Sequence, residues 1–337
     1  MKKGFTLIEL LAVIVVLAVI ALIAVPRIMD AIDDSRKEAF ENNKYMMVKA
    51  TENYLINNQE EIPAENTASI IDLEVLVDEE FIRFSDFDPE DDSCSGYIIA
   101  KNDNGIVSYH PYLKCSGNES DGFLERENLI YHFDASLVVG YEDGEQMDYW
   151  IDVSGNNNNA YQEDENRKPF LSEYNGLPMV EFRGGQSFLI PHDRMGSRVE
   201  DNTVFLVTKA NQTSSRNRIL AFSSGGSSRL TMFVESGSFN YASGAFTPRA
   251  SGTASTNLTL LVGTKSSDDL EFYINENLVG TATLSNASGP DAASIGSWQG
   301  TTQYFNGYIA ELIIYNRALS ASEIEYITNY LNEKWNI

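Results

Sequence analysis

One carboxylate stands at the head of the longest apolar stretch in the sequence. Glu9 directly precedes an uninterrupted apolar run from Leu10 to Val25. An unpaired charge that is buried in hydrocarbon costs several kcal/mol. Glu9 therefore requires a cationic partner, and the chemistry that it indicates is ion pairing within an apolar environment.

The other acidic residues and the histidines do not indicate an enzymatic centre. A retaining glycan hydrolase needs two carboxylates about 5 to 5.5 Å apart, one as nucleophile and one as acid/base. In glucanases with a sandwich fold, an E-x-D-x-x-E run on one strand supplies them, and this sequence contains no such run. Asp148 and Asp152 flank Trp150, in a segment that is more simply a turn beside a core tryptophan. The sequence contains no catalytic triad, phosphate loop or zinc-ligand spacing, and its histidines are scattered (His110, His132 and His192). We therefore expect no enzymatic activity.

A helix at the start of the chain must position Glu9. The run from Leu10 to Val25 gives roughly 24 Å of helix, and counting from Phe5 brings it to about the ~30 Å thickness of a bilayer core. A cleaved secretory signal would place a small-residue cleavage site after this apolar core. Here the helical pattern continues past Pro26 instead, which argues against such a signal.

The residues Gly4-Phe5-Thr6-Leu7-Ile8-Glu9 resemble the prepilin motif of type IV pilins and type II secretion pseudopilins. The resemblance implies that prepilin peptidase cuts between Gly4 and Phe5 on the cytoplasmic side and that Phe5 is then N-methylated. It also implies that Glu9 pairs with the α-amino group of Phe5 on a neighbouring subunit during assembly. Two opposite charges that are unpaired in lipid are stabilised by meeting, which favours one docking register. An uncleaved membrane anchor is the alternative.

The helical pattern continues to about Asn57, so we expect one helix over 5–57, with 5–26 in the membrane or the filament core. Two leader lysines, Lys2 and Lys3, hold the start of the chain in the cytoplasm and leave everything after Pro26 outside. Proline removes a helical hydrogen bond and kinks the preceding turn. The helix of assembled type IV pili melts near a proline at this position, so the resemblance extends to Pro26.

Residues 58–120 are expected to form a small head. Cys94 and Cys115 bracket two alternating strands around a turn at 102–105, and a hairpin brings its ends together. Outside the cytoplasm a disulfide between them is allowed, with two free thiols as the alternative. A short helix is predicted over 70–82. The head is similar to that of Gram-positive pilins, whose C-terminal hairpin packs on the long helix.

Carboxylates crowd residues 72–92, where the only basic residue is Arg83. No spacing there matches the calcium loop of an EF-hand, so we interpret the segment as a solvated face. The net charge of −25 argues against a nucleic-acid partner, which requires clustered lysine and arginine.

Beyond a polar, glycine-rich boundary at 116–122, the sequence changes to short alternating segments separated by Gly, Ser and Asn. This pattern is typical of an antiparallel sandwich. The predicted strands are Leu129–Phe133, Met179–Phe182, Thr203–Lys209, Arg218–Ser223, Leu230–Val234, Leu258–Thr264, Leu270–Ile274 and Tyr308–Tyr315. A final helix begins with the capping box of Ser320 and Glu323, and its packing face carries Ile324, Ile327, Leu331 and Trp335.

Four segments of residues 125–337 resemble the concanavalin A-like, or laminin-G-like, jelly roll. They are WIDVSGN from Trp150, GLPMVEF from Gly176, FYIN from Phe272 and FNGYIAELIIYNRAL from Phe305, followed by the final helix. The expected chain is therefore an α+β pilin followed by an all-β jelly-roll sandwich with a C-terminal helix. Its predicted parts are a leader at 1–4, a helix at 5–57, a head at 58–120 and a sandwich at 125–337.

Recognition residues of a sandwich usually lie on its loops, where aromatic faces stack on sugars and Asn or Arg supply hydrogen bonds. The ligand candidates are Asn156, Arg216, Tyr241, Trp298 and Tyr304. Asp134 and Asp152 could help to hold a structural calcium ion, as in some relatives of the fold. Trp150 and Trp335 are interpreted as core residues.

These observations together predict a minor type IV pilin that displays its sandwich for adhesion to a glycan or a surface protein. Its other expected partners are pilin subunits, prepilin peptidase and the membrane assembly machinery. It would reside in the cytoplasmic membrane before assembly and in the extracellular pilus afterwards. The alternative is a structural pilin or secretion pseudopilin that primes or caps a filament without a ligand, and a glycan hydrolase ranks third.

Overall fold

The computed structural model describes residues 7–86, 94–115, 118–120, 122–192, 198–199, 201–225, 227–243, 249–284 and 287–337. Two compact units share the chain. The first comprises Met1–Asn57, Asp72–Ile98 and Pro111–Ser120, and the second comprises Asn58–Ile71, Ile99–His110 and Asp121–Ile337. The predicted processing residues Gly4 and Phe5 lie outside the described residues, and so does the side chain of Glu9.

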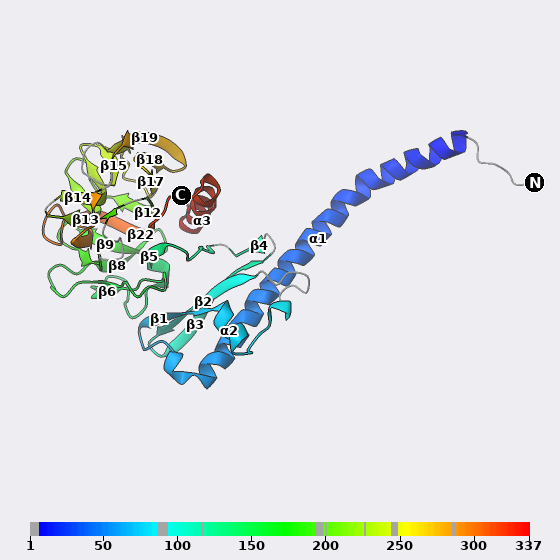
Figure 1. Ribbon diagram of the computed structural model, residues 1–337, viewed down its shortest axis with the longest axis horizontal. Coiled ribbons are helices and arrows are strands. Elements are labelled where there is room, and N and C mark those ends of the chain that lie inside the picture. The colour runs from blue at the N-terminus through cyan, green and yellow to red at the C-terminus, as the bar shows by residue number, and fades with distance from the viewer. Residues whose placement is uncertain are drawn as a thin grey trace, which may run out of the picture. The chain divides into compact units, whose positions relative to one another are not determined.

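The first unit is built on α1, Leu7–Asn57, which spans 51 residues and contains Pro26. Figure 1 shows it as one long blue helix. Its end at Asn57 agrees with the sequence prediction. Apolar side chains along its first half are exposed, including Leu10, Leu17 and Ile20, whereas Met47 near its C-terminal end is fully buried. Two different surroundings are thus implied for the two halves of one helix.

No single helix among the described residues is long and apolar enough by itself to cross a membrane. Two parts of α1, Leu10–Leu22 and Val25–Asn57, meet at an angle of 42° and satisfy that criterion together, by length and composition. Their junction lies directly before Pro26, where the proline ring disfavours a continuous helical turn.

The remaining elements before the sandwich are a short helix and a four-stranded sheet. The sheet has the order β1-β2-β3-β4. The elements are η1 Gln59–Glu61, β1 Thr67–Asp72, α2 Leu73–Asp78, η2 Phe84–Asp86, β2 Ser95–Asp103, β3 Ile106–Cys115 and β4 Asn118–Glu119. Cys94 and Cys115 form a disulfide with their Cα atoms 4.3 Å apart, as the hairpin predicted.

The helix expected over 70–82 is shorter than predicted. Ile70 and Ile71 belong to β1, because β-branched residues favour a strand, and Asp72 has the extended backbone of a helix N-cap (ψ 145°). α2 therefore begins only at Leu73 and buries Leu73 and Leu76.

Close packing in the first unit depends on Gly96. A Cβ atom at this position would lie 2.8 Å from the carbonyl oxygen of Tyr112 and 3.1 Å from Cε of Met47. Any larger residue would push β2 away from α1, so the glycine allows the hairpin and the helix to approach.

The main part of the second unit, Asp121–Ile337, is an antiparallel sandwich followed by one helix. One sheet has the order β16-β15-β14-β13-β21-β10-β7-β6, and the other has β19-β18-β17-β12-β22-β9-β8 with β5 paired to β22. Every strand segment predicted from the sequence lies in a strand, except that β17 begins at Thr259, one residue after the predicted start at Leu258. The short strands β11 Arg198–Val199 and β20 Ala287–Ser288 pair separately.

The bounds of the first group of elements are β5 Leu129–Asp134, η3 Ala135–Leu137, β6 Tyr149–Trp150, β7 Ala160–Tyr161, β8 Phe170–Tyr174, β9 Leu177–Arg183, β10 Phe188–Leu189, β12 Asn202–Ala210 and β13 Asn217–Ser224. Those that follow are β14 Ser227–Glu235, β15 Ser238–Ser243, β16 Ala250–Thr253, β17 Thr259–Ser266, β18 Asp269–Ile274, β19 Asn277–Thr283, β21 Ala292–Ile295, β22 Asn306–Tyr315 and α3 Ala321–Trp335.

A single apolar core joins the two sheets and α3. Trp150 is buried against Phe133 and Phe188, and Trp335 is buried in the same core cluster, as the sequence predicted for both tryptophans. α3 starts with the expected capping box, in which Ser320 and Glu323 satisfy each other's backbone N–H groups. The core holds the two sheets together and so fixes the position of the polar side chains that they carry.

Candidate functional site: an arginine and aromatic cluster

The candidate site is centred on Arg218, at the start of β13. Its guanidinium carbon lies 4.4 Å from the ring centroid of Phe233 and 4.9 Å from that of Trp298. Its Nε donates to Gln303 and one of its terminal nitrogens donates to Thr231, each at a distance of 3.0 Å. Only 3% of Arg218 is exposed, so this guanidinium is held in one orientation by two aromatic faces and two polar partners.

Register places the partners of Arg218 on the same face of the sheet. Arg218 pairs with Phe233 on β14, and alternation puts Thr231, Phe233 and Glu235 on one face of that strand. Leu230, Met232 and Val234 belong to the core on the other face. The cluster therefore lies on the outer face of the sheet.

Two further arginines extend the cluster. Arg216 forms an ion pair with Oε1 of Glu235 at 2.5 Å, and Arg249 forms one with Oε2 at 3.1 Å. Arg249 also lies over the ring of Phe233, 5.1 Å from its centroid. Two guanidinium groups thus share one carboxylate, and the side chain of Arg216 is 41% exposed.

The electrostatics of the cluster favour an anionic ligand. Burial, helped by the neighbouring charge of Arg216, lowers the pKa of Arg218 to about 10, while Glu235 opposes this shift. Arg218 remains charged at neutral pH with this pKa. Guanidinium groups present a planar set of donors that matches carboxylates and sulfates, and aromatic faces accept sugar rings.

Three of the five predicted ligand residues contribute to this cluster. Arg216 and Trp298 do so through the contacts above, and Tyr304 forms a parallel backbone bridge with Arg218. The half-buried side chains of Trp298 and Tyr304 retain some exposed surface. Trp298 and Tyr304 follow Arg218 by 80 and 86 residues in the sequence, so the grouping is hidden until the chain is folded.

The other two predicted ligand residues have different roles. Tyr241 is fully buried and donates from its hydroxyl group to Asn202, so its prediction as a ligand platform is wrong. It alternates onto the core face of β15 beside Phe239. Asn156 donates to the carbonyl groups of Leu129 and Ile130, which fixes its own loop.

Sequence reasoning missed Arg218, Phe233, Arg249 and Gln303 as members of the site. Arg218 lies within a predicted strand. A charged residue inside an apolar strand was a signal that could have marked it as a candidate site residue. Nothing in the local sequence marked Phe233, because an aromatic residue in an apolar strand is normally a core residue.

The predicted metal residues Asp134 and Asp152 are already engaged by the protein. Asp152 accepts hydrogen bonds from the backbone N–H groups of His132, Ser154 and Asn158. Its carboxylate therefore organises the loop after β6. Asp134 accepts the N–H and hydroxyl groups of Ser136 on one oxygen.

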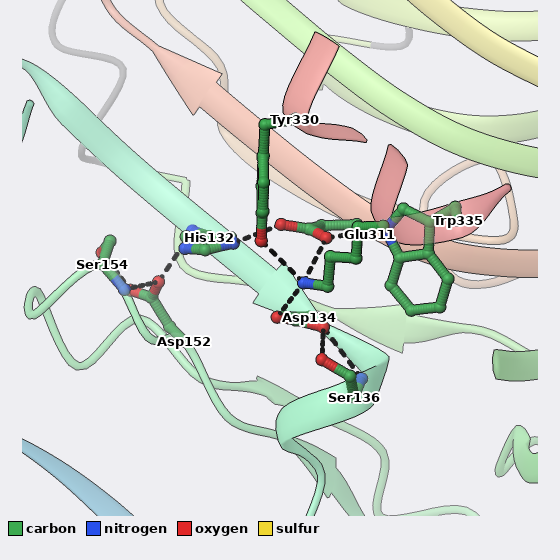
Figure 2. A network of polar contacts seen from close by, with 9 residues as sticks. His132, Asp134, Ser136, Asp152, Ser154, Glu311, Tyr330 and Trp335 are labelled. Atoms are coloured by element: carbon green, nitrogen blue, oxygen red, sulfur yellow. Dashed lines mark hydrogen bonds and ion pairs between the residues drawn. The ribbon is translucent and has the colours of Figure 1, made fainter. Parts of the chain in front are cut away.

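A second polar cluster surrounds Asp134 (Figure 2). Asp134 on β5 lies directly opposite Glu311 on β22. Between their carboxylates lies the ammonium group of Lys334 from α3, with Nζ 2.5 Å from Asp134 Oδ2 and 2.7 Å from Glu311 Oε2. His132 and Trp335 complete the surroundings of Glu311, through ring nitrogens at 2.7 and 2.8 Å.

The charges in this second cluster are mutually dependent. Burial would raise the pKa of Glu311, but Lys334 and His132 outweigh it and hold that pKa well below its usual value. Burial would likewise lower the pKa of Lys334, but Asp134 and Glu311 raise it above its usual value.

Metal-ligand atoms of His132, Asp134 and Glu311 lie within 4.8 Å of one another. The position between the two carboxylates is taken by the Lys334 ammonium group, and the carboxylates are saturated by protein donors. These residues therefore do not fit a divalent cation unless Lys334 moves away. Asp152 is not part of this group, so the predicted calcium ligands do not converge on one another.

Comparison with known proteins gives two family matches. The prokaryotic N-terminal methylation motif matches residues 1–25, and the concanavalin A-like lectin/glucanases superfamily, in its laminin G form, matches residues 183–325. No curated protein matches the chain significantly.

Among solved structures, one is from a study of botulinum neurotoxin type C and its dependence on two ganglioside molecules for cell entry. It is 12% identical, with a TM-score of 0.46 over 61% of this chain and 52% of that chain, so this chain spans about half its length. Domain 4 of the arabinanase AbnA from Geobacillus stearothermophilus, in complex with arabinotriose, is 17% identical over 60% of this chain and 98% of its own, with a TM-score of 0.43. Trypanosoma rangeli sialidase is 12% identical over 70% and 42%, with a TM-score of 0.44.

The helix and the sandwich thus coincide with two independent family matches at opposite ends of the chain. The exposed apolar first half of α1 overlaps the methylation motif, and β12 to β22 fall within the second match. The chain therefore carries the prokaryotic N-terminal methylation motif at residues 1–25 and a concanavalin A-like laminin G domain at residues 183–325.

Proposed function

We propose that this protein is a minor type IV pilin whose sandwich binds an acidic glycan through the arginine and aromatic cluster. The observation that carries the binding proposal is the gathering of Arg218 and Arg249 around aromatic rings, with Arg216 beside them on Glu235, in a chain whose net charge is −25. Local positive charge on an acidic protein selects and orients an anionic ligand, since like charge elsewhere repels it.

The methylation motif and the exposed apolar half of α1 support the pilin part of the proposal. Prepilin peptidase would cut between Gly4 and Phe5, and the helix would enter a filament with other subunits. The protein would lie in the cytoplasmic membrane first and in an extracellular pilus afterwards. A large domain on every subunit would crowd a filament, which favours an occasional or tip position.

A glycan array that contains acidic and neutral glycans tests the binding proposal on the purified full chain in detergent. We expect selective binding of glycans with carboxylate or sulfate groups, and loss of this binding in Arg216→Ala. A charge-assisted hydrogen bond contributes about 1.5 to 3 kcal/mol, so the affinity should fall roughly 10- to 100-fold.

Arg183→Ala is the matched control. Arg183 also pairs with a glutamate, Glu181 at 2.7 Å, and stacks on an aromatic ring, Phe170 at 3.7 Å, but it lies on the other sheet. Its loss should leave glycan binding unchanged. Equal loss in both variants, or an array without hits, would contradict the proposed site. Release of reducing sugar from any bound polysaccharide would contradict a purely binding role.

A further inference from the structure

The second polar cluster has the composition of a reaction centre for amide formation. An amine (Lys334), a carboxyl group (Asp134) and a second carboxylate (Glu311) meet at 2.5 and 2.7 Å. Asp134 and Glu311 are 1% and 0% exposed, whereas Lys334 is 20% exposed. Because Cγ of Asp134 carries Oδ2, Nζ lies within about 3.7 Å of that carbon, near the ~3 to 3.5 Å of poised reactants.

We propose that Lys334 and Asp134 form an intramolecular amide bond, with Glu311 transferring the proton. Nζ passes one proton to Oδ2 of Asp134 along their 2.5 Å hydrogen bond, and the neutral amine then attacks Cγ. Glu311 Oε2 takes the second proton from the nitrogen, which has become acidic, and delivers it to Oδ2. The new C–N bond forms as the Cγ–Oδ2 bond breaks, and Oδ2 leaves as water after it receives the protons released by nitrogen. One ammonium and one carboxylate become one amide and one water, and Glu311 returns to its initial state, so no further reactant is required.

Donors at the other oxygen of Asp134 support this direction of attack. The N–H and hydroxyl groups of Ser136 donate to Oδ1 at 2.8 and 2.6 Å. They would stabilise the negative charge that develops on Oδ1 when Nζ adds to Cγ. Oδ2, which accepts the hydrogen bond from Lys334, is left as the departing oxygen.

Amide formation would change the charge of the cluster. Two buried charges are replaced by a neutral group, which removes their desolvation cost. His132 and Trp335 hold Glu311 at 2.7 and 2.8 Å, so the proton carrier is fixed in place. Exclusion of water from Asp134 and Glu311 also slows the reverse reaction, hydrolysis.

The bond would join the first strand of the sandwich to its last helix. Asp134 ends β5 and Lys334 lies in the last turn of α3, 200 residues later. Such a crosslink would prevent α3 from separating from the sheet, so the sandwich would resist unfolding from its C-terminal end.

Mass spectrometry of the purified full chain, reduced and denatured, tests the proposal. We expect a mass lower by one water than the sequence requires, after leader cleavage and methylation are read from the N-terminal peptide. Protease digestion should release one branched peptide in which Lys334 is joined to Asp134.

The chain contains a matched internal control. Lys168 lies equally close to an aspartate and a glutamate, 2.5 Å from Asp148 and 2.6 Å from Glu165, but these carboxylates are 60% and 75% exposed. Peptides with Lys168 should be linear.

Two variants separate the chemistry from the ion pair. Glu311→Gln keeps the shape of the side chain but cannot carry the proton, and Lys334→Arg keeps the charge but cannot form the amide. Each variant should have the full mass that its own sequence requires, without the loss of one water. A wild-type chain of full unmodified mass with linear Lys334 and Asp134 peptides would overturn the proposal, and so would a water loss that persists in Lys334→Arg.

Discussion

Arg218 shows how one buried cation can organise a surface. Its guanidinium group is held by stacking and hydrogen bonding, and the exposed Arg216 and half-buried Arg249 carry the charge toward solvent. Lysine has the same charge but neither the plane nor the fork of donors. The role of Arg218 is therefore to position the cluster.

We expect Arg218→Lys to lower the free energy of unfolding by about 1 to 3 kcal/mol. The variant loses the stacked contacts with Phe233 and Trp298 and leaves a buried acceptor on Gln303 or Thr231 without its donor. Thermal unfolding of the full chain measures the effect. Arg183→Lys, on an exposed stacked arginine, should change the stability much less, and equal effects would contradict this account.

Glu9 is the residue on which the assembly proposal depends. We expect Glu9→Ala to enter filaments poorly, because the α-amino group of a neighbouring subunit would have no partner in the apolar core. Quantitative immunoblotting of sheared filaments measures this. Glu38→Ala, on an exposed face of α1, is a suitable control, and normal incorporation of Glu9→Ala would count against the pilin role.

The disulfide closes the hairpin of β2 and β3 at its open end. Cys94 and Cys115 are 21 residues apart, and closing a loop of this length should stabilise the fold by about 3 kcal/mol through the entropy of the unfolded chain. We expect Cys94→Ser/Cys115→Ser to have a lower melting temperature for the first unit. Addition of reductant should lower it similarly in the wild type and leave the double variant unchanged.

The start of α3 depends on one carboxylate. Arg317, which donates to both oxygens of Glu323, and the capping bonds with Ser320 lower the pKa of Glu323 to about 2. Because the folded-state pKa is depressed from 4.5, the stabilisation is fully present above about pH 4.5 and is lost as the pH falls toward 2.

We expect Glu323→Gln to lower the free energy of unfolding at pH 7 by about 1 kcal/mol, the usual contribution of a cap. Because the wild type loses this contribution between pH 4.5 and 2, the difference in unfolding free energy between the wild type and the variant should shrink over that range. Denaturant unfolding at several pH values measures both effects. A difference that is independent of pH would contradict the assigned role of the ion pair with Arg317.

The two proposed roles, filament assembly and ligand binding, belong to opposite ends of the chain. α1 carries the exposed apolar surface that an assembly requires, and the sandwich carries the cluster that would contact a ligand. Neither property depends on the other, so removing the sandwich should separate them.

We expect deletion of residues 125–337 to leave filaments that form but do not attach to glycan-coated surfaces. Electron microscopy of the filaments and an adhesion assay measure the two outcomes. Arg216→Ala in the full chain should reproduce the loss of attachment alone. Loss of the filaments themselves on deletion would favour the alternative role, a subunit that primes or caps the filament.

The sequence by itself determined the features that depend on neighbouring residues. The methylation motif, the end of α1 at Asn57, the hairpin between the two cysteines and the capping box of α3 are all encoded within short segments. Strands with long apolar runs, such as β12 and β22, were predicted correctly for the same reason. The two-residue strands β6, β7 and β10 carry too few residues for a period to be visible.

Only the tertiary structure decided which distant side chains meet. Tyr241 and Phe233 are both aromatic residues in strands, yet Tyr241 faces the core and Phe233 supports Arg218. Register pairs Tyr241 with the core residue Met232 and Phe233 with Arg218, and a bulge in β13 follows Arg218. Lys334 reaches Asp134 across 200 residues because α3 packs on the sheet that begins with β5. Pairings of this kind depend on the packing of whole elements, and that information is spread over the entire chain.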